Sequence, residues 1–349
     1  MMNAFPHPIE AGNRGDGSPL TLGDPKQLGD LFVYASGSGY LLVSVFDLDG
    51  NGRNQLVGSS AAIFSFNVCA GLPDGTPIVD RGQRWGETSR APHRDSDPEG
   101  DSGLCGSILT KGDFDGDGYV EALVAPQSIG SGPLMAISPK NGTPMHRSKG
   151  EPVHFEGKEL KRRHQKLAAV DWDGDGRLDL IAIFNNEHEY EPIDPATRKV
   201  PDDIRDRYTT DGRWKGKISG WSLHLLRNTG TSGRHEFTYA GPVALPDGPG
   251  PFRDASGSLC AVNPNDASKG LLLIGYYGDV WHLPLVESGV SPKWGEPKEL
   301  VSLHGAPFTR YAAFTDIDTG DLCDEGRADL LASDISSNVY WCKYFGDDK

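Results

Sequence analysis

The sequence contains no long hydrophobic run. No apolar segment reaches the roughly 18–20 residues that a membrane-spanning helix requires, so we expect no membrane span. Residues 1–17 lack a basic stretch followed by an apolar one, so no signal peptide is expected in this segment. The long amphipathic periodicity of helices is also missing, whereas glycine (45) and proline (25) are abundant. This combination favours an all-β fold of short strands and many turns.

Cysteine and basic residues are both scarce. None of the five cysteines has Cys-x-x-Cys spacing, and the odd number leaves at least one thiol free. Cys105 and Cys260 fall on expected inner strands, where a small buried thiol is the simplest interpretation. The formal net charge of −15 argues against a nucleic-acid partner.

One acidic stretch, Asp171-Trp-Asp-Gly-Asp-Gly-Arg-Leu-Asp179, organises the chain. Carboxylates occupy positions 1, 3, 5 and 9, and glycines occupy positions 4 and 6. Ca²⁺ takes about six to eight oxygen ligands, and the carbonyl of Arg177 is the expected ligand at position 7. An EF-hand places its last acid at position 12 between two helices, whereas the flanks here are short apolar runs typical of strands. The stretch therefore predicts a Ca²⁺ loop at the tip of a β-hairpin.

The pattern recurs along the chain. A copy at residues 47–55 carries Asn51 and Gln55 and is expected to bind more weakly, and a copy at 263–270 lacks the carboxylates and is expected not to bind. The last copy is predicted to open at Asp316 and to close at Asp329, and in all we expect about three to four structural Ca²⁺ sites. The predicted ligand positions are Asp47, Asp49, Asn51, Arg53, Gln55, Asp113, Asp115, Asp117, Tyr119, Glu121, Asp171, Asp173, Asp175, Arg177, Asp179, Asp316, Asp318, Asp324 and Asp329.

Repeats of about 50 to 90 residues that each carry several strands are typical of β-propeller blades. We count five blades, beginning near Tyr40, Leu104, His164, Gly257 and Tyr311, and up to seven are possible. The whole chain, residues 1–349, is interpreted as one propeller domain. Only three strands of the last blade are expected before the sequence ends. The N-terminal segment 1–39 is therefore expected to supply the missing outer strand, through residues 19–33.

These loops and their flanking strands resemble the FG-GAP or VCBS repeats of integrin α-chain propellers, fungal propeller lectins and several polysaccharide lyases. The resemblance covers most of the chain and implies a Ca²⁺-binding β-propeller. It says little about activity, because function lies in sites carried by a fold. Calcium sites of this type suit an extracellular or periplasmic location, and we expect a monomer.

Propeller topology places the metal loops on one face and the connections between blades on the other. Long connections on a rigid scaffold usually carry function. Basic residues gather in these connections, where they would attract an anionic substrate, although a solvated charge run is the plain alternative. The basic and histidine residues in question are Arg90, His93, Arg94, His154, Lys158, Lys161, Arg162, Arg163, His164 and Lys166.

Two histidines flank one hairpin of the third blade: His164 precedes its inner strand and His188 follows the second strand. Both are expected at the channel mouth. An ordered set of two histidines, a tyrosine and an arginine resembles the propeller-fold ulvan lyases, which implies catalytic roles for His164, His188, Tyr239 and Arg253. Tyr239 could instead pack on an outer strand, and Tyr276 or Tyr277 would then replace it.

The resemblance implies β-elimination at a uronate. Arg253 would neutralise the carboxylate, His188 or Tyr239 would remove the C5 proton, and Tyr239 or His164 would protonate the O4 leaving group. Further predicted substrate-binding residues are Arg310, Tyr311, Tyr276, Tyr277, Tyr190, Arg163, Asn186 and His93.

The sequence thus leaves two hypotheses of different classes. The first is an extracellular lyase that cleaves an anionic, uronate-containing polysaccharide. The alternative is a non-catalytic, Ca²⁺-stabilised carbohydrate-binding propeller similar to lectins. Lectin sites tend to repeat in every blade, whereas the predicted catalytic residues are confined to blades three to five, which favours the enzyme.

Overall fold

The computed structural model describes most of the strands and the loops between them. The described residues are 8–13, 19–28, 41–59, 63–73, 75–80, 82–85, 106–126, 134–139, 150–156, 166–185, 221–245, 255–275, 278–289, 291–300, 308, 312, 314–326 and 328–343.

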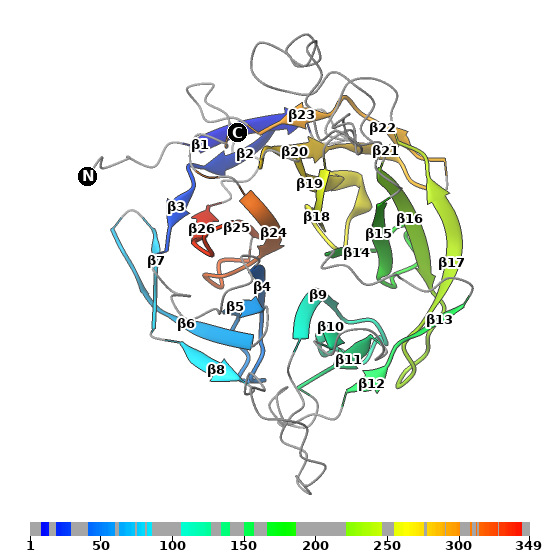
Figure 1. Cartoon of the computed structure of the whole chain (residues 1–349), viewed down its shortest axis with the longest axis horizontal. Coiled ribbons are helices and arrows are strands. Elements are labelled where there is room, and N and C mark those ends of the chain that lie inside the picture. The colour runs from blue at the N-terminus through cyan, green and yellow to red at the C-terminus, as the bar shows by residue number, and fades with distance from the viewer. Residues whose placement is uncertain are drawn as a thin grey trace, which may run out of the picture.

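Five antiparallel sheets stand around a central axis and form a five-bladed β-propeller (Figure 1). Blade one holds β4 (Leu42–Phe46), β5 (Gln55–Ser59), β6 (Ile63–Gly71), β7 (Pro77–Val79) and β8 (Gln83–Trp85). Blade two holds β9 (Gly106–Gly112), β10 (Glu121–Pro126), β11 (Met135–Ile137) and β12 (Glu151–Pro152). Blade three holds β14 (Leu167–Val170), β15 (Asp179–Asn185), β16 (Trp221–Asn228) and β17 (Glu236–Val243). Blade four holds β18 (Ala255–Ala261), β19 (Leu271–Gly275), β20 (Val280–Leu283) and β23 (Lys298–Glu299). Blade five holds β24 (Phe314–Gly320), β25 (Asp329–Asp334), β26 (Val339–Cys342) and β3 (Lys26–Gln27).

The ring closes through the N-terminal part of the chain. Strand β3 pairs with β26, so that Lys26 lies opposite Trp341, and the N–H of Leu28 donates to the carbonyl of Val339 at 2.9 Å. The Lys26 ammonium also donates to Thr76 Oγ1 of blade one at 2.7 Å. Strand β3 falls inside segment 19–33, which the sequence predicted for this role. An early segment therefore completes the last blade.

Three pieces lie outside the simple blade pattern. The hairpin of β1 (Pro8–Asn13) and β2 (Pro19–Gly23) contacts blade four, and β21 (Leu285–Glu287) pairs with β22 (Lys293–Trp294). Strand β13 (His154–Glu156), which follows blade two, pairs in parallel with β17 of blade three. This pairing covers the outer edge of blade three, and it ties two neighbouring blades together.

The described apolar residues form five clusters, and each cluster joins one pair of adjacent blades. The cluster between blades three and four, for example, contains the buried side chains of Trp172, Leu225 and Leu273. Alternating strand residues point to opposite faces of each sheet, so one sheet contributes to two interfaces. The core is therefore a closed series of sheet-to-sheet contacts and has no single centre.

The inner strands carry a buried ionic network along the central axis. Lys166, which precedes β14, lies 3.3 Å from Asp316 of β24, and their side chains are 2% and 1% exposed. Lys111 of β9 lies 2.5 Å from Asp318 of the same strand. Ser258 of β18 donates to Asp316 at 2.6 Å. Side chains from four blades thus meet in these pairs, and Lys166 also donates to the carbonyl of Val43 in the remaining one, blade one.

Among the described residues no helix has the length and hydropathy needed to cross a membrane. The four described cysteines, Cys69, Cys260, Cys323 and Cys342, are free thiols, and Cys260 is buried as predicted.

Candidate metal centres

Four acidic loops join the first strand of a blade to its second strand, and they therefore lie on one face of the ring. We call them loop 1 (residues 47–55, blade one), loop 2 (113–121, blade two), loop 3 (171–179, blade three) and loop 4 (321–329, blade five). The residue at position 2 anchors each loop in the core: Leu48, Phe114, Trp172 and Leu322 are each at most 2% exposed.

Each loop winds around the carboxylate at its first position. In loop 2, Asp113 Oδ1 accepts from the N–H groups of Gly116 and Asp117 at 2.8 and 3.1 Å, and its Oδ2 accepts from Gly118 at 2.9 Å. Asp171 does the same for Gly174 and Gly176 in loop 3. The glycines have φ between +74° and +89°, a region that other residues rarely adopt. The loop shape is therefore fixed by its own Asp and Gly residues.

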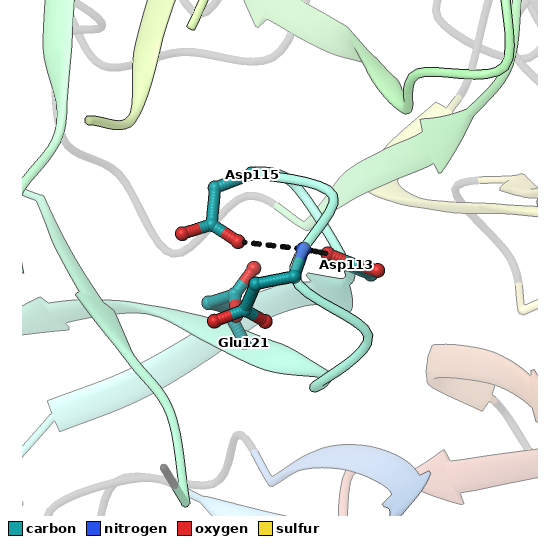
Figure 2. A group of neighbouring side chains, drawn as sticks. Asp113, Asp115 and Glu121 are labelled. Carbon is teal, nitrogen blue, oxygen red and sulfur yellow. Dashed lines mark hydrogen bonds between the residues drawn. The ribbon is translucent and has the colours of Figure 1, made fainter. Parts of the chain in front are cut away.

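Loop 2 gathers four carboxylates into a ring. One oxygen each of Asp113, Asp115, Asp117 and Glu121 lies within 4.8 Å of the others. Figure 2 shows the side chains of Asp113, Asp115 and Glu121 grouped inside the turn. Repulsion between such close negative charges is relieved by a bound cation, and hard cations prefer oxygen ligands of this kind.

Among the acidic residues of loop 2, Glu121 has the surroundings most specific to a metal ligand. The residue is fully buried, and its Oε2 accepts from the N–H of Phe114 at 2.8 Å. Its Oε1 is also buried and has no hydrogen-bond partner. Burial, followed by the charges of the neighbouring aspartates, raises the pKa of Glu121 to about 8. An unpartnered buried carboxylate oxygen is costly, and an ion in the ring would satisfy it.

Loop 3 repeats this arrangement. Asp171, Asp173 and Asp175 have oxygens within 4.8 Å of one another. Asp179 is 3% exposed; its Oδ1 accepts from the N–H of Asn228 at 2.7 Å, and its Oδ2 is buried without a partner. Burial raises the pKa of Asp179 to about 6. Loops 2 and 3 therefore each present one orphaned buried oxygen at position 9.

Loop 1 differs at the same position. Gln55 Oε1 accepts from the N–H of Leu48 at 3.0 Å, as the glutamate does in loop 2. Its Nε2, however, donates to Asn67 Oδ1 at 3.1 Å. The atom that corresponds to the orphaned oxygen is thus an amide nitrogen with a partner of its own. The contacts support the expectation that loop 1 binds a cation more weakly.

The structure corrects the prediction for loop 4. Strand β24 continues to Gly320, so Asp316 and Asp318 lie within it and pair with Lys166 and Lys111 in the channel. Asp321 is the residue at position 1: its oxygens accept from the N–H groups of Glu325 and Gly326 at 2.8 and 2.6 Å. Asp316 and Asp318 are therefore not part of the loop.

Three more features separate loop 4 from loops 2 and 3. Asp324 occupies position 4, which is glycine in the other loops, and it is exposed with φ +54°, so it does not stand at one of the aspartate positions of loops 2 and 3. Cys323 takes position 3, where the other loops have an aspartate. Lys343 Nζ lies 2.8 Å from Glu325 Oε1, so a lysine already supplies a positive charge beside this loop.

The copy at 263–270 in blade four holds no carboxylate ring. Its residues form a short 3₁₀ helix, Ala267–Lys269, and the side chain of the N-cap residue Asp266 accepts from the N–H of Ser268 at 3.1 Å. Asn263 Oδ1 accepts from the N–H of Asn265 at 3.0 Å. Backbone and side-chain hydrogen bonds hold this hairpin tip, and Lys269 Nζ lies 3.9 Å from Asp266 Oδ2.

Most of the predicted catalytic and substrate-binding residues lie outside the described part of the chain. These residues are His164, His188, Arg253, Arg310, Tyr311, Tyr276, Tyr277, Tyr190, Arg163, Asn186 and His93. Lys166, predicted with the basic residues of the opposite face, is instead buried in the channel.

Tyr239 is described, and it lies on β17, at the outer side of blade three. Its hydroxyl is 2.9 Å from His224 Nδ1, and the two rings stack with centroids 5.7 Å apart. His224 Nε2 is in turn 2.7 Å from Ser222 Oγ. This is the outer-strand packing that the sequence left open as the alternative for Tyr239.

Reasoning from sequence missed Asn228, which contacts both loop 2 and loop 3. Only its place at the end of a strand, close to the turn before Glu236, could have drawn attention to it. Comparison of the chain with protein-family models and with curated proteins finds no match.

The glutamate of loop 2 provides a direct test of the metal centre. Glu121→Gln is expected to weaken Ca²⁺ binding at this loop at least about tenfold, because it removes one of four ligand charges. The glutamine of loop 1 shows that such a side chain fits the position. Isothermal titration calorimetry would measure the change, with the exposed Glu287→Gln as a control of equal charge. An unchanged affinity would remove Glu121 from the ligand set.

Proposed function

We propose that this chain is a Ca²⁺-stabilised β-propeller that cleaves an anionic, uronate-containing polysaccharide outside the cytoplasm. The orphaned buried oxygens of Glu121 and Asp179 carry the calcium part of the proposal. Ca²⁺ is favoured over Zn²⁺, which prefers nitrogen and sulfur ligands, and over Mg²⁺, which usually keeps several waters.

Calcium at loops 2 and 3 would join the ends of the first two strands of each blade. We expect two ions to bind tightly, one in each of these loops. Loop 1 should bind weakly because Gln55 is already satisfied, and loop 4 should bind weakly because Lys343 supplies a charge. Equilibrium dialysis that yields two tightly bound ions per chain would agree with this assignment.

The lyase part of the proposal rests on strand direction. Strand β14 begins at Leu167, β15 ends at Asn185 and β18 begins at Ala255, and each of these ends lies opposite the metal loops. In the sequence His164 precedes β14, His188 follows β15 and Arg253 precedes β18. The three connections therefore leave their sheets on one face.

In the proposed reaction, Arg253 neutralises the uronate carboxylate and so acidifies the C5 proton. His188 removes this proton, the C4–O4 bond breaks, and a C4–C5 double bond forms. His164 protonates the departing O4 oxygen. The contacts of Tyr239 with His224 argue against a role for this phenol, so Tyr276 or Tyr277 takes the place of the predicted tyrosine.

The test is a screen of ulvan, pectin-type and glucuronate-rich polymers, with the ultraviolet absorbance of the new double bond as the readout. We expect His188→Ala and Arg253→Ala each to lower the rate by about 10²–10⁴-fold while the melting curve stays unchanged. The exposed Lys293→Ala serves as a control for loss of a surface charge. Glycan binding without any rise in absorbance would support the lectin-like alternative and overturn the lyase.

A further inference from the structure

Asn228 lies between loop 2 and loop 3. It ends strand β16 of blade three and is 3% exposed. Its side-chain amide donates to the carbonyl of Phe114 in loop 2 at 2.7 Å and to the carbonyl of Leu178 in loop 3 at 3.1 Å. Its backbone N–H donates to Asp179 Oδ1 at 2.7 Å. One buried residue thus contacts both predicted metal loops.

The neighbours of Asn228 reach the ligands themselves. The N–H of Gly233, in the turn between β16 and β17, donates to Asp115 Oδ2 of loop 2 at 2.9 Å. Arg227 Nη1 lies 3.1 Å from Asp173 Oδ2 of loop 3. Residues 227–233 therefore hold one carboxylate of loop 2 and two of loop 3.

The turn is itself tied to Asn228. Asn228 Oδ1 accepts from the N–H of Gly230 at 2.9 Å, so both ends of the side-chain amide are used. An amide placed this way cannot shift toward one loop without losing a contact to the other. Loops 2 and 3 are therefore connected through one packed residue whose side-chain amide uses both its nitrogen and its oxygen in hydrogen bonds.

We propose that loops 2 and 3 bind their cations cooperatively, with Asn228 and the 229–235 turn as the coupling element. This inference rests on the proposed Ca²⁺ binding. The first ion orders its own ligands and, through Asn228, those of the second loop, so the second ion binds with a smaller loss of conformational entropy.

Loops 1 and 4 provide a contrast within the same ring. Asn54 Nδ2 donates to the carbonyl of Asp321 at 2.8 Å, which joins loop 1 to loop 4. This bond reaches a backbone carbonyl and no ligand carboxylate. The contact between loops 2 and 3 differs because it ends on the position-9 carboxylate of one loop and on the position-3 carboxylate of the other.

The test is a double-mutant cycle that follows the affinity of loop 3. Loop 2 is disabled by Asp117→Asn with Glu121→Gln, and Asn228→Ala removes the link. Trp172 lies at position 2 of loop 3, so terbium luminescence sensitised by this residue reports the occupancy of loop 3, and Ca²⁺ affinity follows from terbium displacement. Trp172→Phe identifies the share of the signal that comes from loop 3.

With Asn228 present, disabling loop 2 is expected to weaken Ca²⁺ binding at loop 3 by about fivefold to tenfold. With Asn228→Ala, the same change in loop 2 should leave the affinity of loop 3 unchanged within about twofold, although Asn228→Ala lowers that affinity itself by about 10–100-fold. Asn338→Ala, which removes a side-chain amide hydrogen bond to Asp334 Oδ2 in blade five, is the matched control and should preserve the coupling.

The outcomes separate the two proposals. If the wild-type chain binds no Ca²⁺, the calcium proposal itself fails. If it binds two ions whose affinities are independent, the coupling is overturned and the calcium proposal stands. If coupling persists in Asn228→Ala, Asn228 is not the link. If Asn228→Ala does not fold, Asn228→Ser replaces it, because serine keeps a side-chain oxygen for the Gly230 N–H. The comparison of the affinity of loop 3 between the wild type and the loop 2 variant needs no substitution at Asn228.

Discussion

Replacing Lys166 by methionine is expected to lower the free energy of unfolding by about 3–5 kcal/mol, because it leaves a buried carboxylate without its counter-charge. Lys166 and Asp316 are 3.3 Å apart and almost fully buried. The lysine also donates to the carbonyl of Val43 and, at 3.3 Å, to Ser44 Oγ. The substitution therefore leaves a buried negative charge on blade five without its cation, and it removes the lysine donor from Val43 and Ser44 of blade one.

The loss should depend on pH in a defined direction. Burial raises the pKa of Asp316 to about 6 even beside the lysine cation, and removal of that cation would raise the pKa further. The folded variant then binds a proton more tightly than the unfolded chain does. Its stability is therefore highest well below pH 6 and falls as pH rises through the folded pKa. The deficit relative to wild type should therefore shrink as pH falls from the higher pKa of the variant toward about 6, and it should level off below that, where Asp316 is protonated in both folded proteins.

Chemical denaturation at several pH values would measure both effects. Lys293→Met removes an exposed ion pair with Glu287 and serves as the control, since surface pairs contribute little. The double variant Lys166→Met with Asp316→Asn should recover part of the loss, because Asp316 no longer leaves a buried charge without its counter-charge. A stability within about 1 kcal/mol of wild type for Lys166→Met would contradict the importance of the channel network.

The sequence predicted the blades well because each depends on local signals. Alternating apolar strands and an Asp-Gly turn lie within a few residues of one another, and the five predicted blades are the five that the structure contains. Closure of the ring by the N-terminal segment followed from counting strands in the last blade. These steps required no knowledge of distant contacts.

Loop 4 shows where local pattern fails. Asp316 and Asp318 have the same Asp-x-Asp spacing as the start of the other loops. Their actual role is set by Lys166 and Lys111, which are far away in sequence and reach β24 only across the channel. Lys166 was wrongly predicted on the face opposite the metal loops for the same reason, since its partner Asp316 is far away in the sequence. Contacts between inner strands of different blades leave no short-range signal.

In the metal loops the sequence identifies the residue types at the predicted ligand positions, and the structure adds the hydrogen-bond partners of those residues. The sequence ranks Gln55 below Glu121 as a ligand by charge. The structure adds that the amide of Gln55 is already bonded to Asn67, whereas one oxygen of Glu121 has no partner. Such a distinction depends on a neighbouring strand and cannot be obtained from the loop alone.

Removing Ca²⁺ is expected to lower the free energy of unfolding by about 5 kcal/mol when the ion is present at about 100 times its dissociation constant. Each ion that binds only the folded state contributes about 2.7 kcal/mol under that condition, and loops 2 and 3 provide two such sites. The ions would neutralise carboxylate rings whose orphaned oxygens otherwise remain buried without a partner. Denaturation with excess Ca²⁺ and with a chelator would measure the difference.

Variants that change one loop at a time show how much of the Ca²⁺-dependent stabilisation each site contributes. With loop 2 weakened about tenfold, Glu121→Gln should remove about a quarter of the Ca²⁺-dependent stabilisation, and about half if loop 2 no longer binds, although coupling between the loops would remove somewhat more. Asp49→Asn, in loop 1, should have little effect because Gln55 already makes that loop a weak site. The same unfolding free energy with chelator and with Ca²⁺ would mean that the acidic rings hold no ion. The hairpin tips would then be stabilised by their Asp and Gly hydrogen bonds alone.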